Sequence, residues 1–177
     1  MTLRTDKADD IIEAMAQAKR ILISGPSYIN TWPGPLIALL EQAAQHSDRL
    51  KGKRLYGIIN GGMPYVHTHL SGLRTLQLFC RDVGLRWEGG FVLGGGAMLD
   101  GQPLEKHLSH KRMVPAFERF TQHVMAGEPS PDSLYERANG PMPGLVARLV
   151  ARMLNRTVDR RLRDLGQDPY QRHPSAP

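Results

Sequence analysis

Apolar positions along the chain follow two spacings, one typical of amphipathic helices and one typical of buried strands. Helical spacing occurs at residues 6–18, 35–46, 66–83 and 105–126, and short apolar runs occur at 20–24, 54–60 and 86–93. Parallel strands need a crossover connection, which is usually a helix. The alternation therefore predicts an α/β fold with a parallel sheet. We expect residues 54–60 in its middle, because sequential strands joined in this way usually lie side by side.

The chain changes character after this alternating region. The segment AGEPSPDS (126–133) is rich in Pro, Gly and Ser, and a short helix is expected at 133–138. A long amphipathic helix is expected at 144–166, after the segment ANGPMPG. We therefore expect two parts: residues 1–127 as a partial α/β domain, and residues 128–177 as a C-terminal helical extension that packs on it.

The composition narrows the class of protein. Of the 177 residues, 41% are apolar and 23% are charged, as in ordinary globular proteins. No apolar run approaches the roughly 18–20 residues of a membrane span, and the polar first ten residues do not resemble a signal peptide. We therefore expect a cytoplasmic protein.

Metal chemistry has little support in the sequence. Cys80 is the only cysteine, so neither an intrachain disulfide nor a cysteine cluster is possible. Four of the seven histidines occur in two close pairs. His67 and His69 lie two positions apart and would diverge on a helix, and no cysteine or second carboxylate pair supports a metal site at His107 and His110. We expect solvated surface histidines and no metal site.

The net charge of +6 is concentrated near the C-terminus. The helix expected at 144–166 carries an arginine at every fourth position beside an apolar stripe: Arg148, Arg152, Arg156 and Arg160. This pattern suits an anionic membrane surface or nucleic acid, and it equally suits a docked helix with a solvated arginine face. Asp159 interrupts the basic side, and no aromatic residues are interleaved for base stacking. The docked helix is the favoured interpretation, and nucleic acid or a membrane surface is disfavoured as a partner.

Three loops follow the expected strands, at residues 25–33, 61–65 and 94–103. Open α/β sheets bind ligands beyond the carboxyl ends of their strands. The first loop carries Tyr28 and Trp32, and the other two carry glycines, through which a backbone can approach a ligand closely. Together they predict a slot for a planar heteroaromatic ring, on which Tyr28 or Trp32 could stack. The alternative is that both rings only cover the end of the sheet.

Two other motifs in these loops are weak. Ser27 follows Gly25 and Pro26 as in a nucleophile elbow, but Ile29 stands where the second glycine belongs. The triple glycine at 94–96 is not a dinucleotide fingerprint, because Leu99 stands in the place of the third glycine. No catalytic residue is assigned from the sequence.

Four segments carry a family resemblance that covers the chain from about Asp9 to Arg172. They are GPSYINTWPGPLIALL, YGIINGGMP, LRWEGGFVLGGGAMLDGQPLEK and the tail ANGPMPG…DPYQR. The first two resemble the second and third flavin loops of flavodoxin-like NAD(P)H-dependent oxidoreductases, the FMN reductase group. The third resembles that family's last strand and glycine loop. The resemblance implies a flavodoxin-like parallel sheet with flanking helices and hydride transfer from NAD(P)H through bound FMN.

The resemblance also implies which residues hold the flavin. They are Pro26, Tyr28, Ile29, Asn30, Thr31 and Trp32 in the first loop, and Asn60, Gly61 and Gly62 in the second. The implied function is that of an FMN-dependent NAD(P)H oxidoreductase relative, which passes electrons to a quinone, a flavin or another small acceptor.

The chain departs from the family pattern near its N-terminus. The family begins with a strand and a Ser/Thr-rich loop that holds the FMN phosphate at a helix N-terminus, whereas the likeness here starts at the helix before the family's third strand. We therefore expect an N-terminally truncated sheet that lacks the first strands, and weak FMN binding. The exposed edge at 20–24 then favours a homo-oligomer or a complementing chain. The alternative function is a non-catalytic, flavin-free interaction module or half of a split flavoprotein, with the basic C-terminal helix contacting a partner or anionic surface.

Overall fold

Three parallel strands form the sheet in the computed structural model, which describes residues 1–99, 101–107, 109–139 and 144–168. They are β1 (Arg20–Pro26), β2 (Arg54–Gly61) and β3 (Arg86–Gly94), in the order β1-β2-β3. Both neighbouring pairs are parallel. The prediction of a parallel sheet with residues 54–60 in its middle is confirmed.

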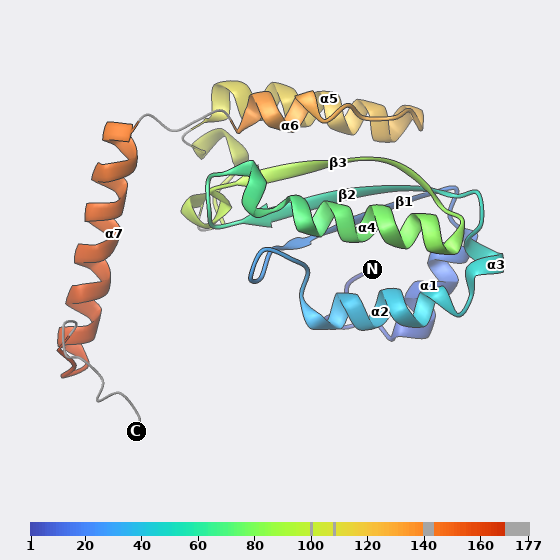
Figure 1. Cartoon of the computed structure of the whole chain (residues 1–177), viewed down its shortest axis with the longest axis horizontal. Coiled ribbons are helices and arrows are strands. Elements are labelled where there is room, and N and C mark those ends of the chain that lie inside the picture. Colours follow the sequence, from blue (N-terminus) through green and yellow to red (C-terminus); the bar gives the residue numbers. More distant parts are fainter. Residues whose placement is uncertain (100, 108, 140–143, 169–177) are drawn as a thin grey trace. The chain divides into compact units, whose positions relative to one another are not determined.

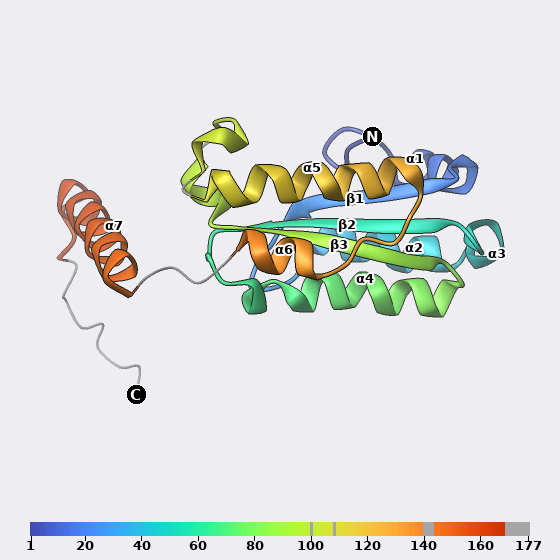
Figure 2. The ribbon, with the colours of Figure 1, turned by 90° about the horizontal axis from the view of Figure 1, so that it is seen from above.

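Helices cover both faces of this sheet (Figures 1 and 2). One face carries α1 (Ala8–Gln17), α2 (Gly34–Ala44), the short α3 (Ser47–Leu50) and α4 (Leu70–Val83), and the other carries α5 (His110–Ala126) and α6 (Ser133–Ala138). Single 3₁₀ turns occur at Val66–Thr68, Gly96–Leu99 and Leu104–Lys106. The predicted α/β class with flanking helices is therefore confirmed.

The core lies between the apolar faces of the helices and the two faces of the sheet. On one face, Leu73 and Leu76 of α4 lie against Gly57 of β2, where an added Cβ would come within 2.7 Å of the Leu76 side chain. On the other face, Phe91 of β3 lies 5.3 Å from Phe117 and 5.5 Å from Phe120, measured between ring centroids. These contacts hold α4 and α5 on opposite sides of the sheet.

The amino ends of the strands are joined by a buried carboxylate. Glu88 is nearly fully buried, and its Oε1 lies 3.5 Å from Arg54 Nε and 3.2 Å from Arg86 Nε. Arg54 also donates through Nη1 to the carbonyl of Gly127, just past the end of α5. A cation at a helix C-terminus interacts favourably with the helix dipole. This cluster therefore ties α5 to the end of the sheet away from the three loops.

The outer edge of β3 is covered by the segment that follows α5. Ser130 donates its backbone N–H to the carbonyl of Glu88 at 2.6 Å. Asn139, at the end of α6, accepts from Gly94 N–H at 2.8 Å and donates to Val92 O at 2.7 Å. The Asn139 amide therefore occupies the place of a further strand, and α6 belongs to the first of two units, Met1–Gly140.

The second unit, Pro141–Pro177, contains α7 (Gly144–Asp164). The helix combines the arginine ladder with the apolar positions expected from the sequence. Its docking on the first unit stays a prediction. Three parts of the expected features lie outside the described residues: residues 140–143 of the segment ANGPMPG, residues 169–172 of the tail resemblance, and Asp100 in the third loop. No helix among the described residues is long and apolar enough to cross a membrane.

Candidate functional site

The loop after β1 is a tight hairpin that projects from the carboxyl end of the sheet. Tyr28 and Thr31 exchange backbone hydrogen bonds of 2.8 and 3.1 Å. The two residues between them, Ile29 and Asn30, have φ values of 48° and 64°, and two-residue hairpin turns favour positive φ at both positions. Asparagine tolerates this conformation, whereas a β-branched residue rarely adopts it. The hairpin leaves 61% of Tyr28 and 97% of Ile29 exposed.

Trp32 closes the end of the sheet. It is only 2% exposed, and its indole N–H donates to the carbonyl of Gly72 on α4 at 2.7 Å. Its ring lies beside Gly25 and Gly72, where an added Cβ would be 3.4 Å from the indole at each glycine. Trp32 therefore has no exposed face on which a planar ligand could stack, and Tyr28 is the ring of this pair that faces solvent.

Hydrogen bonds join the three loops to one another. The carbonyl of Met63 in the second loop accepts from Gly95 N–H in the third at 2.9 Å. Ser27 N–H in the first loop donates to Asn60 O at the end of β2 at 2.6 Å. Ser71 Oγ on α4 donates to Asn30 O at the hairpin tip. The loops are therefore held in place by the protein itself, as a preorganised site requires.

Two histidines stabilise these loops from inside the protein. The Nε2–H of His69 donates to Met63 O at 2.9 Å, because a carbonyl can only accept. His107 Nδ1 accepts from Ser109 N–H at 3.0 Å, which leaves its Nε2–H to donate to Gly94 O at 2.9 Å. His69 and His107 are both buried. The expectation that they are solvated surface histidines is wrong, because loop carbonyls at the strand ends need donors.

The glycines of the second loop have different roles. Gly61 is buried and paired in register with Gly94, and a Cβ there would lie 1.8 Å from His69 Cε1. Gly61 thus makes room for the histidine ring and not for a ligand, whereas Gly62 is exposed. The Oδ1 of Asn60 is buried without a hydrogen-bond partner among the described residues, beside Gly96.

The residues implied as flavin contacts therefore separate into two groups. Trp32 and Gly61 are buried and belong to the packing, and the others are at least partly exposed: Pro26, Tyr28, Ile29, Asn30, Thr31, Asn60 and Gly62. An exposed phenol ring and fixed loop backbone suit the face and polar edge of a planar ring, whereas the Oδ1 of Asn60 is covered by the protein beside Gly96. Among the described residues, no group of three or more His, Cys, Asp or Glu side chains could hold a metal ion.

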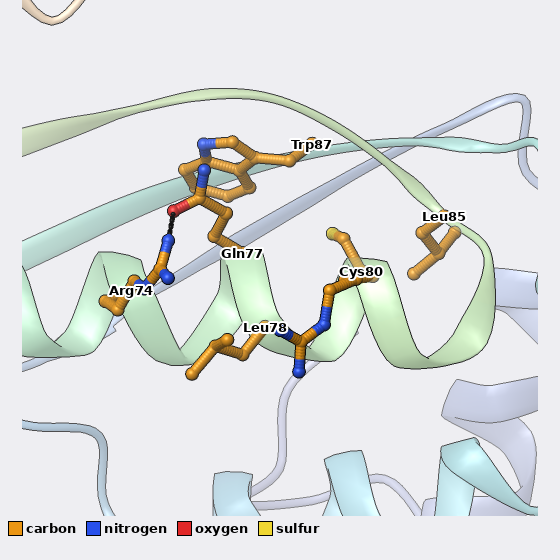
Figure 3. A pocket seen from close by; sticks show the side chains of 7 residues that line it. Arg74, Gln77, Leu78, Cys80, Leu85 and Trp87 are labelled. Carbon is orange, nitrogen blue, oxygen red and sulfur yellow. Dashed lines mark hydrogen bonds between the residues drawn. The ribbon is translucent and has the colours of Figure 1, made fainter.

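A separate pocket lies near the opposite ends of the strands (Figure 3). It has a volume of about 310 Å³ and is lined by Arg74, Gln77, Leu78, Cys80, Arg81, Leu85 and Trp87. Arg74 donates to Gln77 Oε1 at 2.6 Å, and Arg81 pairs with Asp82. The lining residues come from α4, from Leu85 just before β3, and from Trp87 in β3, so the pocket is distinct from the loop cluster.

No protein-family model matches the sequence, and no curated protein matches it. Solved structures do share the fold. An apo NADH:FMN oxidoreductase is similar with a TM-score of 0.54 and 20% identity, over 81% of this chain and 71% of that chain. An NADPH-quinone reductase from P. pentosaceus is similar with a TM-score of 0.52 and 13% identity, over 68% of this chain and 76% of that chain.

A third structure is similar over a smaller part. The Trp repressor binding protein from Bacillus subtilis has a TM-score of 0.45 and 19% identity, over 48% of this chain. This chain spans 60% of the length of that protein. The likenesses to these first two structures show that this chain has a flavodoxin-like fold.

Proposed function

We propose that the protein binds the flavin ring of FMN on its three carboxyl-end loops and acts as an NAD(P)H-dependent oxidoreductase. The electrons would pass to a quinone, a second flavin or another small acceptor. The observation that carries the proposal is the exposed ring of Tyr28, on a hairpin whose tip is bonded to α4 through Ser71. Open α/β sheets bind ligands beyond the carboxyl ends of their strands, where this hairpin lies. The fold shared with an NADH:FMN oxidoreductase and an NADPH-quinone reductase supports the same function.

Each part of the ring has a candidate partner among these residues. Tyr28 would stack on the ring face, because its own ring is exposed at the base of the hairpin. Gly62 is exposed and would let loop backbone approach the ring edge. In the family that this chain resembles, the phosphate is held by a loop that comes before the region corresponding to Asp9 of this chain. No described residue is assigned to the phosphate here, and the contacts proposed for this chain are contacts with the ring.

Bound FMN would supply the redox chemistry, by taking hydride from NAD(P)H and passing electrons to the acceptor. The residues of this chain would bind and orient the ring and keep one of its faces open to the co-substrate. The hydrogen bonds of Met63, Ser27 and Ser71 would hold the loops in place during turnover. No proton transfer is assigned to a side chain.

Steady-state oxidation of NADH and NADPH tests the activity, with added FMN and a soluble quinone as the acceptor. We expect a rate above that of the same mixture without protein, and a lower rate for Tyr28→Ala. Met125→Ala is the matched control, because Met125 is exposed near the amino end of β1, where Arg20 contacts its carbonyl. A protein that binds no flavin and adds nothing to the background rate would instead support the flavin-free interaction module.

A further inference from the structure

The outer edge of β1 has backbone groups that can be identified residue by residue. At one end of the strand, Lys19 O accepts from Arg54 N–H at 3.4 Å, and at the other, Asn60 O accepts from Ser27 N–H at 2.6 Å. In a parallel pair, alternate residues direct both their N–H and C=O toward the same neighbour. The odd-numbered residues of β1 therefore face β2. The N–H and C=O groups of Arg20, Leu22 and Ser24 point away from the sheet.

Among the described residues, no segment covers these outward groups of β1 as the segment after α5 covers β3. The β3 edge is bonded to Ser130 and to the Asn139 side chain. In the part of the chain that the structure describes, no hydrogen bond ends on an outward backbone group of Arg20, Leu22 or Ser24. The sheet therefore has one covered edge and one edge that can accept another strand.

The side chains of β1 do not block such pairing. Natural edge strands are usually protected by prolines, by charges or by bulges. On this edge, Pro26 lacks an N–H and ends the free segment, and Arg20 is held by its hydrogen bond to Met125 O. Between them, Leu22 is 46% exposed and Ser24 is also exposed. The edge from Arg20 to Ser24 is therefore short, free of interior charge and partly apolar.

We propose that this edge is the docking site for β1 of a second copy of the chain. The two strands would pair antiparallel about a two-fold axis at Leu22, which would join both sheets into one. Leu22 would then face Leu22 of the second copy on the same side of the sheet, and each Arg20 would face a Ser24. Residues directly opposite on antiparallel strands lie about 4.5–5.5 Å apart at Cβ, so the exposed Leu22 side chains would cover each other.

Charge and symmetry favour a second copy over an unrelated strand. The two Arg20 residues would be four positions apart, about 14 Å along the strand, so like charges would not oppose each other. Each cation would instead face a neutral hydroxyl. The outward set, Arg20, Leu22 and Ser24, is complementary to itself in this register, which is the requirement of a two-fold interface. The proposal is independent of flavin binding.

The strength of the association can be bounded. Three facing residue pairs would exchange about six backbone hydrogen bonds. A strand pair buries less than the roughly 1,600 Å² of a standard interface. We therefore expect a reversible dimer that forms at micromolar concentration, on the order of 1–100 μM.

Sedimentation equilibrium of the full chain over this concentration range tests the proposal with two substitutions at one position. Ser24→Pro removes an outward N–H without touching the bonds between β1 and β2, and Ser24→Ala keeps that N–H. We expect the wild type and Ser24→Ala to dimerise and Ser24→Pro to stay monomeric. A wild type that is monomeric throughout, or a dimer that Ser24→Pro leaves intact, would overturn the proposal.

Hydrogen exchange of the wild type keeps the test decisive if the proline variant fails to fold. We expect the amides of Leu22 and Ser24 to gain protection as concentration rises. The amides of Ile21 and Ile23 face β2 and should be protected at every concentration. If Leu22 and Ser24 are equally protected in the monomer, another segment covers the edge and the proposal is wrong. If they stay unprotected in the dimer, the copies meet elsewhere and it is also wrong.

Discussion

Ile29 holds an unfavourable backbone conformation at the tip of the first loop. Its φ of 48° brings a β-branched side chain into the left-handed region, which costs an L-residue about 1–2 kcal/mol. We expect Ile29→Asn to raise the free energy of unfolding by about 1 kcal/mol, because asparagine tolerates this region. Urea denaturation measures the difference. Ile29→Val is the control, since it keeps the β-branch, and equal stability of the two variants would show that the turn is not strained.

We expect the buried ring of Trp32 to contribute to the free energy of unfolding. Replacing a buried tryptophan by alanine costs about 3–5 kcal/mol, and Trp32→Ala should fall in this range. Trp32→Phe should lose less, about 1–3 kcal/mol, mainly because Gly72 O loses its donor. Trp87→Phe is the comparison in the same urea experiment, because Trp87 is only half-buried. Trp32 variants as stable as the wild type would contradict the role of this ring in the core.

The buried thiol of Cys80 leads us to expect that the folded protein loses stability at alkaline pH. Burial raises the pKa of its thiol from 9.0 to about 12, so the folded state holds this proton more tightly than the unfolded state. Its stabilising effect is complete below pH 9 and is lost as pH rises toward 12. Burial also raises the pKa of Tyr56 and of Tyr135, which adds to the same trend.

Urea unfolding from pH 8 to pH 11 measures this dependence. We expect the free energy of unfolding to fall with rising pH above 9, and to fall less steeply in Cys80→Ala than in the wild type. Identical slopes for the two proteins would show that the thiol does not contribute.

At the scale of elements, Asn139 joins α6 to the outer edge of β3. Its amide accepts from Gly94 N–H and donates to the carbonyls of Val92 and Tyr135. We expect Asn139→Ala to lower the free energy of unfolding by about 1–3 kcal/mol, because partly buried backbone groups lose their partners. Asn155→Ala is the control, because Asn155 is exposed on α7. A loss no larger than that of the control would mean that water replaces the amide.

The elements and their order follow from the sequence, whereas the contacts of the loops do not. Apolar spacing places all three strands and the main helices, because burial of one face imposes a local period. The burial of Trp32 depends on Gly72, forty residues away, and the burial of His69 depends on the missing side chain of Gly61. Such contacts have no periodic signal. In the sequence, the trace of such a contact is a polar or aromatic residue in a loop together with a glycine elsewhere in the chain that leaves space for its ring.

At the scale of the whole molecule, the two proposals concern separate regions of the first unit. The carboxyl ends of the strands carry the hydrogen-bonded loops, with Tyr28 exposed. The outer edge of β1 carries the proposed docking strand. Because β1 supplies the first loop at its end and the free edge along its side, dimerisation would also stiffen the strand on which the hairpin is built.

Parallel titrations with FMN and with riboflavin, followed by flavin fluorescence, test the central claim most directly. If ring contacts carry the binding, the two dissociation constants should agree within about threefold, a difference of roughly 0.7 kcal/mol. Tyr28→Ala should weaken both ligands by roughly two- to tenfold, the value of an aromatic stacking pair. Met125→Ala should leave both unchanged. The absence of flavin binding, or equal affinities for the wild type and Tyr28→Ala, would contradict the account.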